Sequence, residues 1–169
     1  MNGKNTAHKI VTAAMLASLT CVITMIIKIP SPLKGYVNIG DCVVLLAGWL
    51  LSPTYAFLAA GVGSALADVF SGYIIYAPAT FIIKGAMALI AYYAPKLLPK
   101  KTKNLFKQIV GGAIAEIWMI LGYFVFEGFL YGFVPSLVNI PANSVQGLAG
   151  LILGILFIKI FERNKISFR

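Results

Sequence analysis

The sequence predicts an all-α integral membrane protein, a bundle of six transmembrane helices with both ends of the chain in the cytoplasm. Of its 169 residues, 60% are hydrophobic and only 11% are charged, whereas a water-soluble domain carries about 25% charged residues. Proline- and glycine-containing interruptions divide the apolar sequence into segments near the ~20 residues that a helix needs to cross a bilayer. The short alternating segments typical of a membrane barrel are missing from the sequence, so helices are expected to satisfy the backbone hydrogen bonds in lipid.

The first three helices are predicted over residues 7–27, 39–51 and 53–70. Pro30 and Pro32 end the first helix, because proline lacks a backbone donor and restricts the residue before it. The second helix is short for a full crossing. "SPTY" at 52–55 predicts a tight turn, in which Pro53 suits the first turn of the third helix.

The last three helices are predicted over residues 76–93, 106–131 and 138–161. Pro95 and Pro99 follow the fourth helix, and a lysine-rich loop separates it from the fifth. With no composition shift that would mark a linker, we expect residues 1–169 to form one transmembrane domain in the cell membrane.

The basic residues predict the orientation of the chain. The formal net charge is +9, and Lys and Arg concentrate in cytoplasmic segments of membrane proteins. An inside location for the two chain ends, the turn at 52–55 and the lysine-rich loop places 11 of the 14 basic residues there. These are Lys4, Lys9, Lys96, Lys100, Lys101, Lys103, Lys107, Lys159, Arg163, Lys165 and Arg169. Residues 28–40, 71–76 and 132–137 then face outward.

Several function classes are disfavoured by what the sequence lacks. The basic residues have no interleaved aromatic residues and no soluble fold, so lipid, and not nucleic acid, is the expected partner. Cys21 and Cys42 lie inside predicted helices without metal-ligand spacing and are expected to pack as small apolar residues. His8 is the sole histidine, and no hydrolase, metalloprotease or nucleotide-binding motif occurs. We expect no cofactor, no metal site and no enzymatic activity.

Four ionisable residues lie within or beside the predicted spans: Asp68, Lys84, Glu116 and Glu127. Intramembrane charges usually pair inside the bundle and mark a site or a pathway. Helical spacing places Glu116, Tyr123 and Glu127 on one face of the fifth helix, and the depth of Lys84 lets its side chain reach toward either glutamate. The alternative is that such a pair only fastens two helices.

Further polar residues gather at the predicted outer end. "GYVNIGD" at 35–41 begins the second helix, and Asn139, Asn143 and Gln146 form an amide stripe on the sixth. Convergent polar and aromatic groups in an apolar setting are what a small-molecule site needs. Interhelical amide contacts, a tyrosine belt and capping of the second helix by Asp41 are the alternatives. The predicted substrate-binding residues are Tyr36, Asn38, Asp41, Tyr76, Lys84, Glu116, Tyr123, Glu127, Asn139, Asn143 and Gln146.

Small residues in the first helix predict a close helix contact. Ala13 and Ala17 form a small-xxx-small pair near the cytoplasmic side, which lets another helix approach closely. On spacing alone, packing within the bundle explains this pair and also Gly147, Gly150 and Gly154 of the sixth helix.

Together these features resemble the S components of energy-coupling factor (ECF) transporters, the small substrate-capture subunits for vitamins. The matching features are the six-span length, Ala13 and Ala17, and three stretches in order: "IPSPLKGYVNIGD", "GYIIYAPATFIIKG" and "IPANSVQG". The resemblance implies that Ala13 and Ala17 contact a transmembrane coupling subunit, which works with two ATPase subunits. It also implies that the loop from Tyr36 to Asp41 closes over a pocket, and that the S component topples in the membrane to move its substrate inward.

The ligand expected from the side chains is a small vitamin-like heterocycle. Lys84 suits a phosphate, carboxylate or phenolate, and the glutamates suit a ring nitrogen or ammonium group. A vitamin B6 form or a hydroxymethylpyrimidine is favoured, with riboflavin as a close rival. Three other functions stay open: a membrane-embedded enzyme using Glu116 or Asp68, a stand-alone proton-coupled carrier, and an assembly subunit whose buried charges merely pair.

Overall fold

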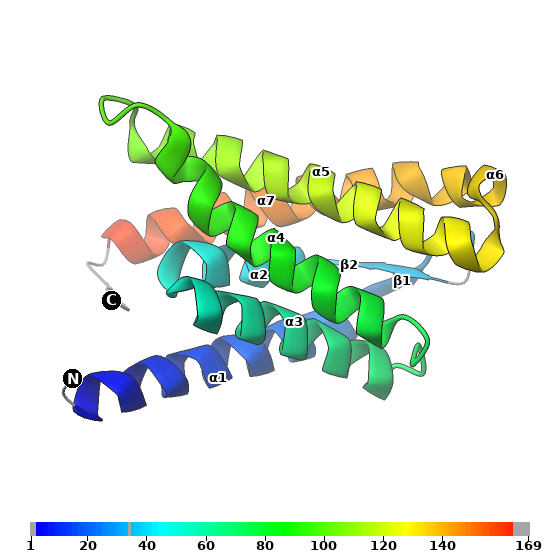
Figure 1. The fold of residues 1–169 in the computed structure, drawn as a ribbon, viewed down its shortest axis with the longest axis horizontal. Coiled ribbons are helices and arrows are strands. Elements are labelled where there is room, and N and C mark those ends of the chain that lie inside the picture. Colours follow the sequence, from blue (N-terminus) through cyan, green and yellow to red (C-terminus); the bar gives the residue numbers. More distant parts are fainter. Residues whose placement is uncertain (1–2, 34, 164–169) are drawn as a thin grey trace.

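The computed structural model describes residues 3–33 and 35–163, with side chains from residue 6 onward, and these residues form a helical bundle (Figure 1). Lys34, Lys165 and Arg169 lie outside the described residues. The elements in chain order are α1 (Gly3–Ile26), β1 (Lys28–Pro30), β2 (Tyr36–Asn38), α2 (Asp41–Leu50), α3 (Pro53–Phe70), α4 (Ala77–Leu97), α5 (Asn104–Tyr131), α6 (Phe133–Ser136), a 3-10 turn (Leu137–Asn139) and α7 (Ile140–Arg163).

Five stretches within the described residues are long and apolar enough to cross a membrane, in α1, α3, α4, α5 and the α6–α7 segment. Helix α4 differs from the expected end at Tyr93, because it continues through Pro95 to Leu97. A proline in the last turn of a helix removes a single intrahelical hydrogen bond, and Pro95 packs closely against Gly111 of α5.

Helix α2 is short and lies at the centre of the bundle. Its ten residues span roughly 15 Å, about half of a hydrocarbon core of ~30 Å. Nine of them, from Asp41 to Trp49, are buried. Helices α3, α4 and α7 pack around it, so this helix is apolar on every side, as expected for an enclosed helix.

A short β-hairpin lies beyond the start of α2, at the end of the bundle where α3 joins α4 (Figure 1). Strands β1 and β2 are antiparallel, with Ile29 opposite Val37, and the Ser31 amide donates to the Gly35 carbonyl at 2.9 Å. The three residues of β1 are exposed, whereas β2 is half-buried and ends on the buried Asn38. The sequence did not predict this hairpin, because strands of three residues are too short to show an alternating pattern and Pro30 disfavours a strand.

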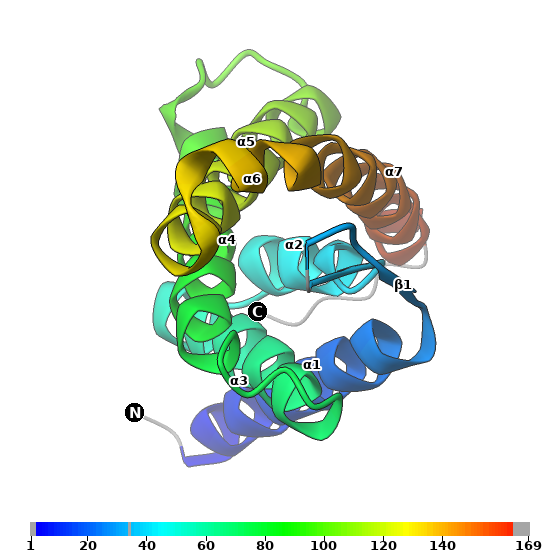
Figure 2. The same ribbon diagram turned by 90° about the vertical axis from the view of Figure 1, so that its right-hand side faces the viewer.

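The chain crosses back and forth along the long axis of the molecule. The hairpin, the α3–α4 connection and the α5–α6 turn lie at one end, on the right of Figure 1. The start of α1, the α4–α5 loop and the end of α7 lie at the other. Viewed along this axis, the hairpin lies beside α2 and between α7 and α1 (Figure 2). We call these the hairpin end and the lysine end.

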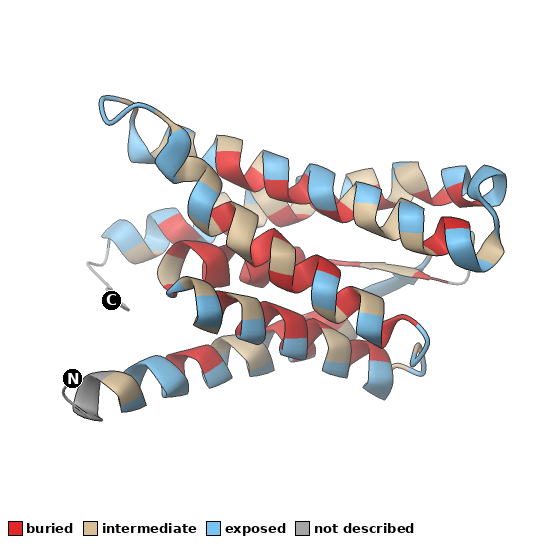
Figure 3. Cartoon of the chain, viewed as in Figure 1, coloured by how far each residue is buried: buried red, intermediate tan, exposed pale blue. Residues whose placement is uncertain are grey.

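Burial follows the membrane pattern. Buried residues face the bundle axis and exposed ones face outward on most helices (Figure 3). The outward residues include large apolar side chains such as Met15, Ile82 and Phe129, which are 66%, 59% and 79% exposed. Apolar surface of this extent is rare on soluble proteins, and it fits contact with acyl chains.

Candidate functional site

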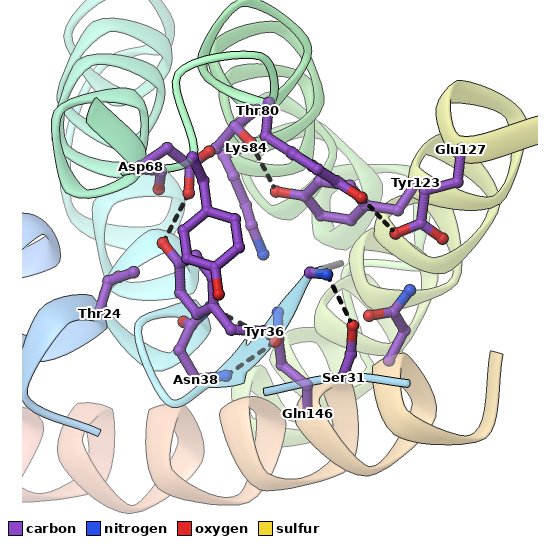
Figure 4. Close-up of a pocket in the computed structure, with 15 residues that line it drawn as sticks. Thr24, Ser31, Tyr36, Asn38, Asp68, Thr80, Lys84, Tyr123, Glu127 and Gln146 are labelled. Carbon is purple, nitrogen blue, oxygen red and sulfur yellow. Dashed lines mark hydrogen bonds between the residues drawn. The ribbon is translucent and has the colours of Figure 1, made fainter. Parts of the chain in front are cut away.

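A polar cavity of about 30 Å³, partly open to solvent, lies between the hairpin and the surrounding helices (Figure 4). Its walls come from α1, the hairpin, α3, α4, α5 and α7. Eight of the eleven residues predicted to bind substrate line it: Tyr36, Asn38, Tyr76, Lys84, Tyr123, Glu127, Asn143 and Gln146.

Seven further residues line the same cavity and were not among the predicted binding residues: Thr24, Ser31, Gly35, Ser64, Asp68, Tyr73 and Thr80. Helical spacing contained a signal for two of them. Thr80 lies one turn before Lys84, and Ser64 lies one turn before Asp68, so each shares a face with an ionisable residue. The Thr80 and Tyr123 hydroxyls are 3.0 Å apart, which joins α4 to α5 beside the cavity.

Lys84 and Asp41 form an ion pair at the base of the cavity. Gln146 extends it, because its Nε2 donates to Asp41 Oδ2 at 2.8 Å and its Oε1 accepts from the Asn38 amide at 2.9 Å. This network joins α4, α2, α7 and β2. The sequence analysis expected Lys84 to be able to reach toward Glu116 or Glu127, whereas the rotation of α4 and α2 places its ion pair on Asp41.

The turn that leads into α2 is held by Asn38, and not by Asp41. Asp41 is fully buried, and both of its oxygens bind side chains of other helices. Helix α2 has no side-chain cap at Gly40, but Asn38 Oδ1 accepts the Gly40 amide at 2.8 Å. The alternative role of Asp41 as a helix cap is thus contradicted, and Asn38 instead fixes the turn from β2 into α2.

Tyrosines form the outer wall of the cavity. The Tyr36 hydroxyl donates to Asp68 Oδ1 at 2.6 Å, which ties the hairpin to the end of α3. Burial, and the neighbouring charge of Asp68, raise the pKa of the Tyr36 phenol, which therefore stays protonated and a donor. The rings of Tyr36 and Tyr73 lie 4.8 Å apart, Tyr73 and Tyr76 lie 6.3 Å apart, and Tyr76 contacts Phe126 at 5.3 Å.

Glu127 organises the opposite wall. Its Oε1 accepts from Asn139 Nδ2 at 2.9 Å and from the Tyr76 hydroxyl at 3.4 Å. Asn139 also accepts from the Leu33 amide at 3.2 Å and donates to the Leu33 carbonyl at 3.3 Å. The Asn139 side chain thus links the hairpin to Glu127 of α5 and to the 3-10 turn that precedes α7.

Three predicted binding residues lie outside the cavity lining: Asp41, Asn139 and Glu116. Asp41 and Asn139 lie behind it and hold Lys84 and Glu127. Glu116 is 5% exposed and packs against Gly147 and Gly150 of α7, and neither of its oxygens has a hydrogen-bond partner among the described residues.

Some polar atoms at the cavity are left unused by the fold. Asp68 Oδ2 and Glu127 Oε2 are buried without a partner within the described chain. The Asn143 amide likewise makes no hydrogen bond to residues 3–33 or 35–163. Since buried polar groups are nearly always paired, these atoms are available to a bound molecule. Across the described ranges, no three or more His, Cys, Asp or Glu residues are grouped to hold a metal ion.

The predicted docking pair on α1 packs inside the bundle. Ala13 is buried, Ala17 is half-buried, and a Cβ on Gly63 of α3 would lie only 2.4 Å from the Ala17 carbonyl oxygen. Glycine at 63 therefore permits the close approach of α1 and α3. The exposed face of α1 instead presents Ala14 and Ser18, also four residues apart.

Comparison with known proteins agrees with this architecture. The family model of the ECF-type riboflavin transporter S component matches residues 4–163. A Pyrococcus woesei protein described as an uncharacterized protein in a gap 3' region is 37% identical over 134 residues, which cover 79% of this chain and 87% of that protein.

Solved structures show the same fold. The S component of a bacterial ECF transporter superposes with a TM-score of 0.76 and 26% identity, over 94% of this chain and 98% of that one. The S component for biotin from an ECF-type ABC transporter superposes with a TM-score of 0.62 over 98% of this chain and 94% of that one, at 17% identity, which supports the fold alone. The all-α membrane bundle predicted from the sequence is thereby confirmed, and the chain belongs to the family of ECF-type riboflavin transporter S components.

Proposed function

We propose that this S component captures riboflavin from outside the cell in the cavity beneath the hairpin. The observation that carries the proposal is the pair of unused carboxylate oxygens on Asp68 and Glu127, with the Asn143 side chain lining the same cavity beside a row of tyrosines. Carboxylate oxygens accept hydrogen bonds from hydroxyl and ring N–H groups, and an amide both donates and accepts. A heteroaromatic ring with a hydroxylated chain supplies those groups.

We place riboflavin ahead of the vitamin B6 forms and hydroxymethylpyrimidine that the side chains alone favoured. The description of the matching family supports riboflavin. So does the row of aromatic rings from Tyr36 to Phe126, which offers a large ring system several stacking partners. The pairing of Lys84 with Asp41 also removes the free cation that would favour a phosphorylated B6 form.

Delivery into the cell is proposed to need partners. The chain would hand its substrate to a transmembrane coupling subunit driven by two ATPase subunits, and would catalyse no reaction itself. The α1 face that includes Ala14 and Ser18, beside Ala13 and Ala17, is our proposed contact with the coupling subunit. Because the cavity measures only about 30 Å³, the hairpin, held by Tyr36 and Asn139, would move aside to admit the vitamin and then close over it.

Thermal unfolding of the purified protein against a vitamin panel tests the proposal. Riboflavin at 100 times its dissociation constant is expected to stabilise the protein by about 2.7 kcal/mol, while pyridoxine, hydroxymethylpyrimidine and biotin leave it unchanged. Asn143→Ala is expected to weaken riboflavin binding by roughly 3- to 10-fold, the effect of one lost hydrogen bond. Ser144→Ala is the matched control, because Ser144 bonds to the Ile140 carbonyl and does not line the cavity.

The outcomes separate the rival functions. Stabilisation by a B6 form or the pyrimidine alone would replace riboflavin but keep the capture role. No stabilisation by any vitamin would favour an assembly subunit. Transport by the isolated chain in liposomes would support a stand-alone carrier, and chemical turnover of a panel member would support an enzyme.

A further inference from the structure

A second cavity lies at the lysine end, away from the site described above. It lies between the last turns of α2, α4 and α7 and the first turns of α5, measures about 380 Å³ and is partly open to solvent. No residue is shared between the linings of the two cavities. Nothing in the capture of a substrate beneath the hairpin requires this second space.

The lining of this cavity has two chemical characters. Trp49, Leu50 and Ile158 contribute apolar surface, and Trp49 and Ile158 belong to the hydrophobic core. Lys96 and Lys107 contribute ammonium groups. A space with apolar walls and a basic rim is complementary to a molecule that carries an apolar chain and an anionic group.

The two lysines have no carboxylate partner in the part of the chain that the structure describes, where the one ion pair is that of Lys84 with Asp41. The Lys96 ammonium lies 3.0 Å from the ring centroid of Tyr92, which holds it beside the cavity. One acid, Glu162, also lines the space, and it accepts a hydrogen bond from Gln108 Nε2 at 3.3 Å. The lining therefore keeps a net positive charge.

The position of the cavity in the bilayer indicates which anionic molecules it meets. It lies where four helices end, at the level of lipid headgroups, and the distribution of basic residues predicts that this end faces the cytoplasm. The cytoplasmic leaflet is rich in anionic lipids, and basic pockets between transmembrane helices on that side suit their headgroups. We propose that this cavity binds an anionic phospholipid, with its phosphate at Lys96 and Lys107 and an acyl chain along Trp49 and Ile158.

A lipid is favoured over the other sources of an anion. Free phosphate would use the lysines but not the apolar wall. An acidic segment of a partner protein would match the positive charge of the lining. A phospholipid matches this charge and also the apolar wall, and its acyl chains are already present at this depth.

Native mass spectrometry of the full chain, released from detergent with added lipid, tests the proposal. Phosphatidylglycerol is expected to bind with one-to-one stoichiometry. Phosphatidylcholine and inorganic phosphate are expected not to bind. Each lysine near a phosphate contributes about 1 kcal/mol, so the double variant Lys96→Gln/Lys107→Gln is expected to weaken phosphatidylglycerol binding on the order of 30-fold. Glu162→Gln is expected to strengthen it, because it removes the opposing charge.

The control is Lys100→Gln/Lys101→Gln, which removes the same charge from the neighbouring loop outside the cavity. This variant is expected to keep phosphatidylglycerol binding. Equal weakening in both double variants would show a diffuse charge effect and overturn the site, as would equal binding of phosphatidylcholine. Competition of inorganic phosphate with phosphatidylglycerol would also overturn the lipid site. Loss of phosphatidylglycerol binding only when the ECF module is present would assign the cavity to a protein partner. Riboflavin stabilisation, measured on the same variants, reports separately on the site beneath the hairpin.

Discussion

At the scale of single residues, the ion pair of Lys84 with Asp41 is the most consequential contact in the molecule. Both side chains are almost fully buried, and Gln146 occupies the second carboxylate oxygen. A buried charge without its counter-charge is strongly unfavourable. The pair therefore both sets the base of the cavity and fixes how α2, α4 and α7 meet.

We predict that Asp41→Asn lowers the free energy of unfolding by about 3–5 kcal/mol, because the buried Lys84 ammonium loses its ion-pair partner. Glu116→Gln is the matched control, since Glu116 is also a buried acid but has no hydrogen bond or ion pair to lose within the described residues. It is expected to change stability by less than about 1 kcal/mol. Denaturation monitored in detergent compares the two, and equal effects would contradict the role assigned to the pair.

The Asp41 carboxylate also shows why the partner of a single residue is hard to predict from the sequence. The sequence predicted Asp41 to bind substrate or to cap the second helix, and an isolated charge is costly in lipid. Its partner could not be identified, since Lys84 lies 43 residues away and Gln146 lies 105 residues away. Spacing along one helix says nothing about the rotation of another.

At the scale of elements, the hairpin and α1 differ most from expectation. Tyr36 and Asn139 each join the hairpin to a separate wall of the cavity. The element is too short to show a strand pattern, and its pairing depends on the helices that surround it. Similarly, the two small-residue pairs of α1 are equivalent in sequence, and only the position of Gly63 shows which pair faces α3.

We predict that Ser18→Trp spares riboflavin binding and abolishes uptake in the assembled transporter, because it adds bulk on the exposed face of α1. Ala13→Trp is a poorer probe of docking, since Ala13 lies in the core and its replacement disturbs the packing of α1 on α3. Vitamin uptake into proteoliposomes, beside binding by the purified chain, provides the measurement. Full uptake by Ser18→Trp would move the docking surface away from this face.

At the scale of the whole molecule, charge and topology agree on two distinct ends. The hairpin end carries the polar cavity, and the lysine end carries the basic loop and the second cavity. An S component with this arrangement would load its substrate at one membrane surface and meet its energising partners near the other. The orientation itself remains a prediction from the basic residues.

Labelling of single cysteines in intact cells tests this orientation. Val134→Cys at the hairpin end is expected to react with a membrane-impermeant maleimide, because Val134 is 79% exposed. Lys101→Cys in the basic loop is expected to react only after the cells are permeabilised. Cys21 and Cys42 are buried and should give little background. Labelling of Lys101→Cys from outside would reverse the orientation.

The sequence by itself determined that this chain is a helical membrane protein, roughly where its helices lie, and which end gathers polar residues. These properties depend on hydropathy, helical period and charge, which are readable along one dimension. The tertiary structure decided that Lys84 pairs with Asp41, that Glu116 stays apart from the cavity, and that a hairpin lies beyond the start of α2. Those outcomes depend on the rotation and depth of helices relative to one another, which are set by packing between residues far apart in the chain.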